Sequence, residues 1–137
     1  MSRVIEQTVH FSVPGRELFG TYLDSTRHAA AIGSTVSVSR DAGAEFRAYD
    51  GGLTGHNLAI IPDCLIVQSW RASVWQTDDP DSVLILTFGD DEAGGRIDLV
   101  QVNVPEHAVD MIDTGWKQHY WQPWSAYFEG RSVPTPV

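Results

Sequence analysis

The sequence predicts an α+β fold in which a curved antiparallel sheet of about seven strands wraps around one long C-terminal helix. Two observations predict these layers. About 70 residues from Ser34 onward read as short strands separated by turns, and residues 109–129 read as one aromatic-rich amphipathic helix. A third observation, a pair of short helical segments after the first strand, places two helices between strands one and two. Short turns between consecutive strands favour antiparallel pairing.

The N-terminal part is predicted to contain one strand and then the two short helices. Residues 3–11 alternate between two sets of side chains and end at Phe11, a pattern typical of a half-buried strand. Pro14 suits the first turn of a helix, and apolar residues at helical spacing follow it, namely Leu18, Phe19, Tyr22 and Leu23. Asp24 can cap a second helix, which Gly33 ends.

Six further strands follow, each separated from the next by residues that favour turns. The separators are the segments DAG, DGG, Pro62-Asp63, TDDPD and DDEAGG. We expect the strands at Thr35–Ser39, Ala44–Tyr49, Thr54–Ile61, Cys64–Ala72, Ser82–Gly89 and Gly95–Val104. Pro105 then ends the last strand before the long helix.

The C-terminal helix has an apolar face broad enough to cover the sheet. Its apolar row recurs every four residues, at Trp116, Tyr120, Trp124 and Phe128. A helix of this length spans roughly 30 Å at about 1.5 Å per residue. Pro123 removes one backbone donor and crowds the carbonyl of His119, so we expect a kink there. Residues 1–130 are predicted to form a single domain, and residues 131–137 a flexible tail.

The composition excludes several classes of partner. Nine basic and 18 acidic residues give a net charge of −9, which repels nucleic acid and anionic membranes. No segment has the roughly 20 apolar residues of a membrane span, and the N-terminus lacks the apolar run of a signal peptide. We therefore expect a cytoplasmic protein. The single cysteine, Cys64, excludes an internal disulfide, and its place at the start of a predicted strand favours a buried structural thiol.

Several segments match one family in both order and spacing. They are DAGAEFRAYDGGLTGHN, with a glycine-rich turn and an Asp-Gly; IIPDCLIVQSWR, a proline turn and a strand ending in Trp70-Arg71; Gly95-Arg96 in the second of two paired strands; and Gly115-Trp116 in the long helix. With these segments, the chain from Val4 to Glu129 resembles the C-terminal domain of the heat-shock-protein-90 ATPase activator, within the START-like (SRPBCC) superfamily. The resemblance implies the helix-grip fold.

The resemblance also bears on two residues and on partners. A glycine at position 115 would let the helix approach the sheet closely, and Trp116 would then fill the space between them. The family name implies chaperone contact and a role in stress. The activator proper has a separate N-terminal domain that makes much of that contact, and this sequence has no room for one. The resemblance therefore implies chaperone contact less strongly than it implies the fold.

The sequence carries no catalytic or metal-binding motif. The five histidines are dispersed, none with HExxH spacing, and one cysteine excludes the usual cysteine-rich zinc patterns. The acidic clusters around Asp79 and Asp91 lie in predicted turns, while Asp110 and Asp113 suit the start of a helix. No nucleophile elbow, phosphate-binding loop or dinucleotide fingerprint is present. We therefore predict no catalytic residue, no metal and no cofactor.

The candidate site is instead a cavity between the helix and the sheet. The candidate lining residues are aromatic and histidine side chains, namely Tyr49, His56, Trp70, Trp116, His119, Tyr120 and Tyr127. Mostly aromatic walls with a few polar groups suit a small, flat hydrophobic ligand. A core filled by the same side chains, with their polar tips satisfied, is the alternative.

Three functions are compatible with these features. The first is a non-catalytic START-like module that binds a small hydrophobic ligand or a protein partner. The second is an enzyme of the polyketide cyclase or dehydratase type, in which His119, Tyr127 or His56 would transfer protons. The third is a homodimer formed through sheet edges or exposed aromatics, because not all of the five tryptophans, Trp75 and Trp121 among them, are expected to fit inside.

Overall fold

The computed structural model describes residues 2–132, with side chains described for residues 3–130, and its seven strands form one antiparallel sheet. The order in the sheet is β1-β7-β6-β5-β4-β3-β2, so the chain is a meander in which the first strand pairs with the last. The strands are β1 (Ser2–Phe11), β2 (Val36–Ser37), β3 (Glu45–Ala48), β4 (Leu53–Ile61), β5 (Leu65–Ala72), β6 (Ser82–Asp91) and β7 (Gly94–Pro105). The predicted fold class is confirmed, although β2 is much shorter than expected.

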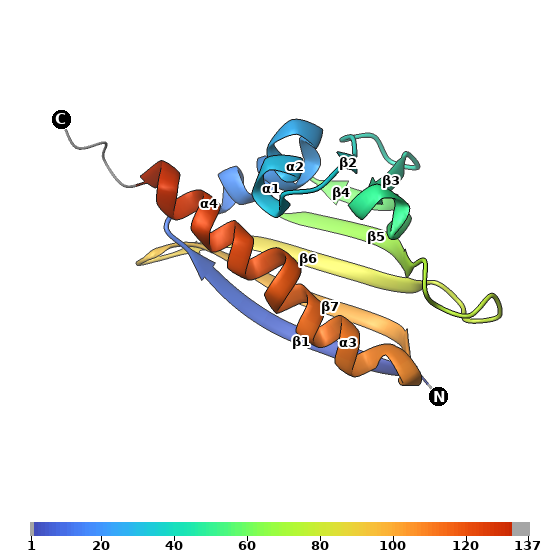
Figure 1. Cartoon of the computed structure of the whole chain (residues 1–137). Helices are drawn as coiled ribbons and strands as arrows, with labels where there is room; N and C mark the ends of the chain where they lie inside the picture. Colours follow the sequence, from blue (N-terminus) through green and yellow to red (C-terminus); the bar gives the residue numbers. More distant parts are fainter. Residues whose placement is uncertain (1, 133–137) are drawn as a thin grey trace.

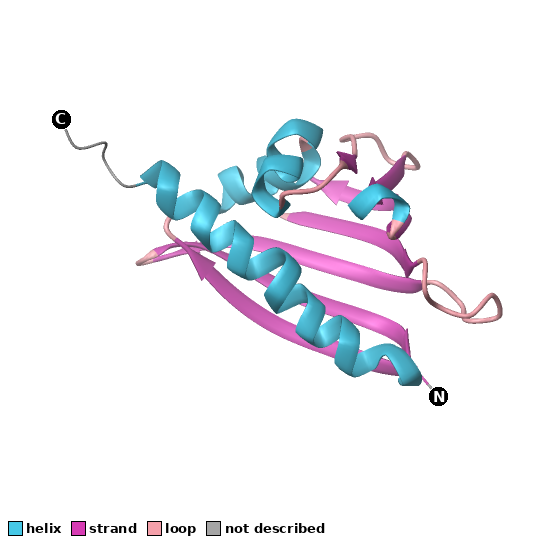
Figure 2. Cartoon of the chain, viewed as in Figure 1, coloured by secondary structure: helices cyan, strands magenta, loops and turns pink. Residues whose placement is uncertain are grey.

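The helices lie on one face of this sheet (Figures 1 and 2). They are α1 (Gly15–Leu23), α2 (Ser25–Ile32), the short turns η1 (Tyr49–Gly51) and η2 (Glu106–Ala108), and the long C-terminal helix, composed of α3 (Val109–Gly115), the π-helical segment η3 (Trp116–Trp121) and α4 (Gln122–Ser132). The carboxylate of Asp24 caps α2 by accepting from the N–H of Arg27 at 2.9 Å, and Gly33 ends it with a left-handed φ of 70°.

The core fills the space between the sheet and the long helix. Its helix side is the predicted four-residue row, whose members Trp116, Tyr120, Trp124 and Phe128 are at most 2% exposed. The sheet side consists of alternate residues of the strands, for example Ile66, Gln68, Trp70 and Ala72 of β5. All five tryptophans are buried, including Trp75 and Trp121 at 6% and 5% exposure. The expectation of exposed tryptophans at a dimer interface was therefore wrong, because both rings pack against other tryptophans.

The close contact predicted at Gly115 lies elsewhere. A Cβ atom at Gly115 would meet only the Cδ2 atom of His119, at 3.9 Å. A Cβ atom at Gly95 of β7 would instead lie 2.4 Å from the carbonyl oxygen of Val13 and 2.7 Å from a methyl group of Leu18. Gly95 therefore lets the start of α1 pack onto the β6–β7 hairpin, and Gly115 leaves open space beside the long helix.

Two other local expectations changed. Cys64 is exposed, not buried, because it lies in the turn that precedes β5 and outside the alternation of that strand. We expected a kink at Pro123. The irregularity found is the π-helical segment Trp116–Trp121, which ends two residues before the proline. In Figure 1 the long helix crosses the sheet as one rod. Of the predicted tail, residues 131–132 belong to α4, and residues 133–137 lie outside the described part of the chain.

Candidate functional site

A pocket of about 640 Å³ opens between the first half of the long helix and the end of the sheet at which β4 begins and β5 ends. Most of α1 and α2 lies toward the opposite end of the sheet, beside α4 (Figure 1). The lining is mostly apolar and consists of Tyr49, Gly52, Leu53, Trp70, Ala72, Ser73, Val74, Asp110, Met111, Ile112, Thr114, Gly115, Trp116, Gln118, His119 and Tyr120. Volume and lining are typical of a site for a small organic molecule.

Aromatic rings from three elements form the wall of this pocket. Alternate residues of β5 face the core, and Trp70 is one of them. Trp116 and Tyr120 project from the π-helical segment. The ring centroid of Trp116 lies 4.7 Å from that of Tyr120 and 5.8 Å from that of Trp70. Tyr49 adds a fourth ring, 6.3 Å from that of Tyr120.

The turn η1 holds Tyr49 in an unusual backbone conformation. Tyr49 and Asp50 both have a positive φ, of 52° and 55°, although neither is glycine. Such conformations cost free energy and persist where tertiary contacts maintain them. Here the hydroxyl group of Tyr49 donates a 2.6 Å hydrogen bond to the carbonyl oxygen of His119, which ties the turn to the long helix. Partial burial raises the pKa of the Tyr49 hydroxyl group, so Tyr49 stays protonated and acts as a donor.

The polar tips of the helix aromatics are used inside the protein. The indole N–H of Trp116 donates to Oε1 of Gln101 at 2.8 Å. The amide of Gln101 donates in turn to the hydroxyl group of Ser82, which donates to the carbonyl oxygen of Trp70. Within residues 2–132 the buried indole N–H of Trp70 has no acceptor. Of these two indoles in the pocket wall, that of Trp116 is thus engaged within the protein, and that of Trp70 is a buried donor without a partner in the described part of the chain.

His28 lies behind Tyr120 and was not among the predicted site residues. Its Nδ1–H donates to the carbonyl oxygen of Tyr22 at 2.7 Å, so its Nε2 atom accepts from the hydroxyl group of Tyr120 at 2.9 Å. Burial lowers the pKa of His28 to about 4 against the opposing effect of the Tyr22 carbonyl, and burial also raises the pKa of Tyr120 well above its usual range. The sequence signal was present, because His28 shares one helical stripe with Ala31 and Ile32.

A second buried chain of polar groups supports the same region of the sheet. The hydroxyl group of Tyr22 donates to Gln68 at 2.9 Å, and the amide of Gln68 donates to Asn57 at 2.9 Å. The amide of Asn57 then donates to the carbonyl oxygens of Ser39 and Asp41. These buried side chains are thus mutually satisfied, which gives the sheet and α1 one defined arrangement beneath the long helix.

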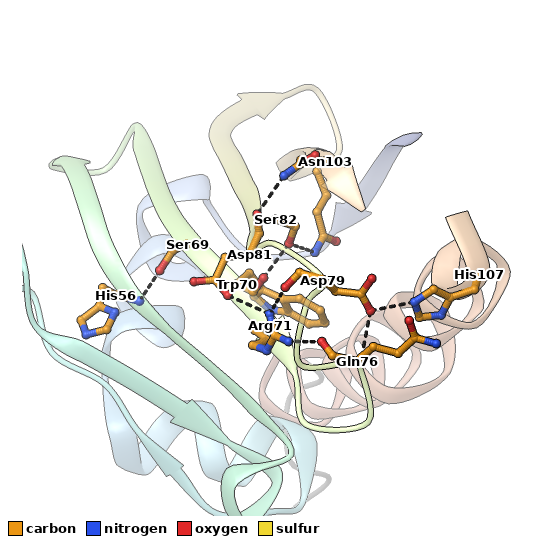
Figure 3. A network of polar contacts seen from close by, with 11 residues as sticks. His56, Ser69, Trp70, Arg71, Gln76, Asp79, Asp81, Ser82, Asn103 and His107 are labelled. Carbon is orange, nitrogen blue, oxygen red and sulfur yellow. Dashed lines mark hydrogen bonds and ion pairs between the residues drawn. The ribbon is translucent and has the colours of Figure 1, made fainter. Parts of the chain in front are cut away.

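The rim of the pocket includes the loop between β5 and β6, which a polar network holds in place (Figure 3). Arg71 donates to the carbonyl oxygens of Gln76 and Asp79 and lies 3.2 Å from the carboxylate of Asp81. His107 lies 2.7 Å from the carboxylate of Asp79. Desolvation would raise the pKa of Asp79, but the hydrogen bonds from His107 and Gln76 and the nearby charges lower it overall. The loop therefore carries Val74, which is 73% exposed, at a defined position on the rim.

The structure brings together five of the seven candidate residues, Tyr49, Trp70, Trp116, His119 and Tyr120. His119 lines the pocket from its exposed rim. The prediction for His56 was wrong, because on β4 it is adjacent to the inward-facing Asn57 and therefore points to the outer face, 4.0 Å from Glu45. Tyr127 is half-buried beside Phe128, two turns along the helix, and does not line the pocket.

The described residues offer little for metal chemistry. Nowhere between residues 2 and 132 do three histidine, cysteine, aspartate or glutamate side chains gather as metal ligands. No helix in the same range is long and apolar enough to cross a membrane. The pocket lining itself consists of aromatic rings, aliphatic groups and a few polar groups. Asp110 is its single acidic side chain.

Comparisons with known proteins agree with this architecture. The family described as "Activator of Hsp90 ATPase homolog 1-like protein" matches residues 12–129. An activator of 90 kDa heat shock protein ATPase homolog from Dictyostelium discoideum is 21% identical over 118 residues, which are 86% of this chain and 31% of the relative. The human activator homolog 1 is also 21% identical, over 82% of this chain and 33% of its own length. The chain thus spans about a third of the length of these curated relatives.

Solved structures show the same fold. The crystal structure of an HSP90 activator from Plasmodium falciparum superposes with a TM-score of 0.80 at 22% identity, covering 94% of this chain and 96% of the other. Because the family match extends over most of the chain and includes every residue that lines the pocket, the chain belongs to the Activator of Hsp90 ATPase homolog 1-like family, a branch of the START-like (SRPBCC) superfamily with the helix-grip fold.

Proposed function

We propose that this chain is a non-catalytic START-like domain that binds a small, flat hydrophobic ligand between its long helix and its sheet. The observation that carries the proposal is the open pocket of about 640 Å³, with four aromatic rings in its wall. A filled core would have left no such space beside Trp116, and the small side chains of Gly115 and Ala72 leave this part of the lining unfilled. We place this activity in the cytoplasm.

The chemistry of the wall supports binding over catalysis. The two histidine nitrogens of His28 are both engaged, and its lowered pKa keeps it neutral at neutral pH. The raised pKa values of Tyr49 and Tyr120 remove them as bases in the same range. Neither pocket hydroxyl, Ser73 nor Thr114, is hydrogen-bonded to a histidine in the described part of the chain. A general base next to a nucleophile, which covalent catalysis needs, is therefore lacking.

Two glycines of the long helix provide a matched test. Gly115 lines the pocket and a Cβ atom there meets only His119, whereas a Cβ atom at Gly130 meets no atom within 4 Å. Replacing either glycine by leucine should lower the free energy of the helical state by a similar amount, about 0.8 kcal/mol. Gly115→Leu places its side chain in the pocket, and Gly130→Leu lies on α4 outside it.

The measurement is binding of the neutral, flat fluorophore N-phenyl-1-naphthylamine. The unmodified protein and Gly130→Leu should bind it with equal affinity, and Gly115→Leu should weaken binding by about tenfold, or 1.4 kcal/mol. Native mass spectrometry of protein purified from its own host should in parallel show an adduct of a few hundred daltons, the size range of a drug-like ligand. No fluorescence increase with the unmodified protein and no adduct would refute the proposal.

A protein partner is the second candidate. The rim exposes two apolar side chains, Val74 at 73% and Met111 at 56%. Relatives of this chain are named as activators of a chaperone ATPase, which makes a chaperone the partner to test first. The chaperone itself should be titrated with the unmodified chain and with Met111→Ser. Complex formation that is lost in this variant would favour the second candidate over the first.

The enzymatic alternative has support from one structural neighbour. A protein in the dynemicin biosynthetic locus superposes with a TM-score of 0.75 at 17% identity, over 92% of this chain and 47% of the other. Turnover of a polyketide-type aromatic precursor, followed by mass spectrometry, tests this alternative. Activity that is lost in His119→Ala would support it, because His119 is the histidine at the pocket rim.

A further inference from the structure

The pocket is unevenly equipped with polar groups. Within the aromatic wall, the hydroxyl group of Tyr49 is bonded to a backbone carbonyl, that of Tyr120 to His28, and the indole N–H of Trp116 to Gln101. The indole N–H of Trp70 is buried and has no hydrogen-bond partner among the described residues. A carboxylate or phosphate inside the pocket would therefore lose its hydration without gaining a donor from Tyr49, Tyr120 or Trp116, which is costly for an anion.

The charges at the mouth have one sign. Asp110 is the single acidic residue of the lining, it is exposed, and neither lysine nor arginine contributes to the lining. The one lysine of the chain, Lys117, lies on the same helix but pairs with Asp113 at 3.8 Å. The other titratable groups of the lining are His119 at the rim and the hydroxyl groups of Tyr49 and Tyr120 in the aromatic wall. The chain as a whole carries a net charge of −9, which adds to the negative potential at the mouth.

Aromatic faces favour cations as well as apolar groups. The face of a tryptophan or tyrosine ring attracts an ammonium group through its quadrupole, more strongly where water is excluded. Trp70, Trp116 and Tyr120 line the pocket but are each at most 3% exposed, so the half-buried ring of Tyr49 offers the more accessible aromatic face. We expect a protonated amine at the mouth to lie against this aromatic lining and to pair with the carboxylate of Asp110, which lines the same pocket.

We infer that the pocket selects a ligand with a flat hydrophobic body and a positively charged amine, with the amine held at the mouth by Asp110, and that it discriminates against carboxylates. This inference rests on the proposed ligand-binding function and names the chemical class of the ligand. The aromatic wall takes the body of the ligand, and the carboxylate at the start of α3 decides which head group is accepted.

Three probes with the same body and different charge separate this inference from the general proposal. They are 1-naphthylmethylamine, 1-naphthalenemethanol and 1-naphthoate, titrated calorimetrically at pH 7.5 into the full chain. The amine should bind about threefold to tenfold more tightly than the alcohol, as expected for a cation near aromatic faces and one exposed carboxylate, and naphthoate more weakly than the alcohol. The preference for the amine should shrink at high salt.

Two aspartate variants assign the selectivity. Asp110→Asn should reduce the amine affinity to within about twofold of that of the alcohol, while the alcohol affinity, which reports an intact pocket, stays unchanged. Asp63→Asn is the matched control, because it makes the same change of charge in the exposed turn at the other end of the β4–β5 hairpin. It should bind all three probes like the unmodified protein.

The outcomes distinguish the two claims. Equal binding of amine and alcohol, or tightest binding of naphthoate, would overturn the selectivity and leave the proposed ligand-binding function standing. An amine preference that persists in Asp110→Asn, or disappears equally in Asp63→Asn, would overturn the role of Asp110. Failure of all three probes to bind, at concentrations at which N-phenyl-1-naphthylamine binds, would overturn the inferred ligand class alone. Failure of all four would overturn both claims.

Discussion

The hydroxyl group of Tyr49 donates a 2.6 Å hydrogen bond to the backbone carbonyl of His119, the carbonyl that a helix would ordinarily pair with the N–H four residues later. That later residue is Pro123, which has no N–H. The hydroxyl group of Tyr49 thus donates to a carbonyl that has no N–H partner at the α-helical spacing and that lies in the π-helical segment. The bond joins two walls of the pocket, so it couples the geometry of the site to the irregularity of the long helix.

Removing this donor should destabilise the protein in a way that depends on Pro123. Tyr49→Phe should lower the free energy of unfolding by about 1 kcal/mol, because the carbonyl oxygen of His119 loses the hydrogen bond from this hydroxyl group. In a Pro123→Ala background the cost should fall, since an N–H becomes available to the same carbonyl. Urea unfolding of the four proteins of this double-mutant cycle measures the coupling. An equal cost of Tyr49→Phe in both backgrounds would contradict the relationship.

His28 should make stability depend on pH between its unfolded and folded pKa values. Because burial lowers the folded pKa from 6.5 to about 4, the unfolded chain binds a proton in this window that the folded chain does not. The free energy of unfolding should therefore decrease as the pH falls from 6.5 towards 4, by about 3 kcal/mol from this residue. Above pH 6.5 the contribution is constant.

The measurement is denaturant unfolding at several pH values in this range, with His28→Gln as the test variant. An amide can replace both hydrogen bonds of His28 without titrating, so the variant should show a shallower pH dependence. His56→Gln removes a histidine from the outer face of the sheet and should retain the slope of the unmodified protein. Identical slopes for all three proteins would show that His28 does not titrate as inferred.

Gln101 should be among the most sensitive polar positions in the core. It is fully buried and links the indole N–H of Trp116 to the hydroxyl group of Ser82. Gln101→Leu leaves the N–H of Trp116 buried without an acceptor, which should cost about 1–3 kcal/mol in chemical unfolding. Gln122→Leu on the exposed side of α4 is the control and should change stability by less than about 0.5 kcal/mol. A similar effect of both changes would argue against the buried network.

Arg71 should control the mobility of the pocket rim more than global stability. Its guanidinium group contacts two carbonyl oxygens and one carboxylate in the β5–β6 loop, and a lysine cannot reproduce that fork of donors. In Arg71→Lys, hydrogen exchange at the amides of Gln76 and Asp79 should accelerate by about tenfold, a local opening cost of 1.4 kcal/mol. Arg96→Lys, whose partner Asp98 lies on β7, should leave these amides unchanged. Unchanged exchange in Arg71→Lys would show that other contacts hold the loop.

Much of the fold could be predicted because it follows from local patterns. The period-two alternation of residues 3–11 and the four-residue recurrence from Trp116 to Phe128 each report which side chains an element buries. Turn residues such as Pro62-Asp63 mark where strands reverse. The aromatic composition of the pocket wall followed from the same patterns, and Trp70, Trp116 and Tyr120 lie where a gripping helix and a curved sheet would bring them together.

The details of the site depended on pairing between distant segments. Trp70 and His56 both occupy strands, but only the register between β4 and β5 sets them on opposite faces. The bulge between Asn57 and Ala59 shifts that register within β4, which alternation alone cannot reveal. Cys64 was assigned to a strand that begins one residue later, and this difference of one position moved it from the core to the surface.

By itself, the sequence determined the order of the elements, the antiparallel meander, the apolar face of the long helix and the acidic charge of the surface, because each is encoded by neighbouring residues. The tertiary structure decided that a pocket exists beside Gly115 and that His28, 92 positions from Tyr120, holds the hydroxyl group of its ring. It also decided that the hydroxyl group of Tyr49 donates to the carbonyl oxygen of His119, four residues before Pro123. Such contacts join groups far apart in the chain, and only the packing of helix on sheet brings them within hydrogen-bonding distance.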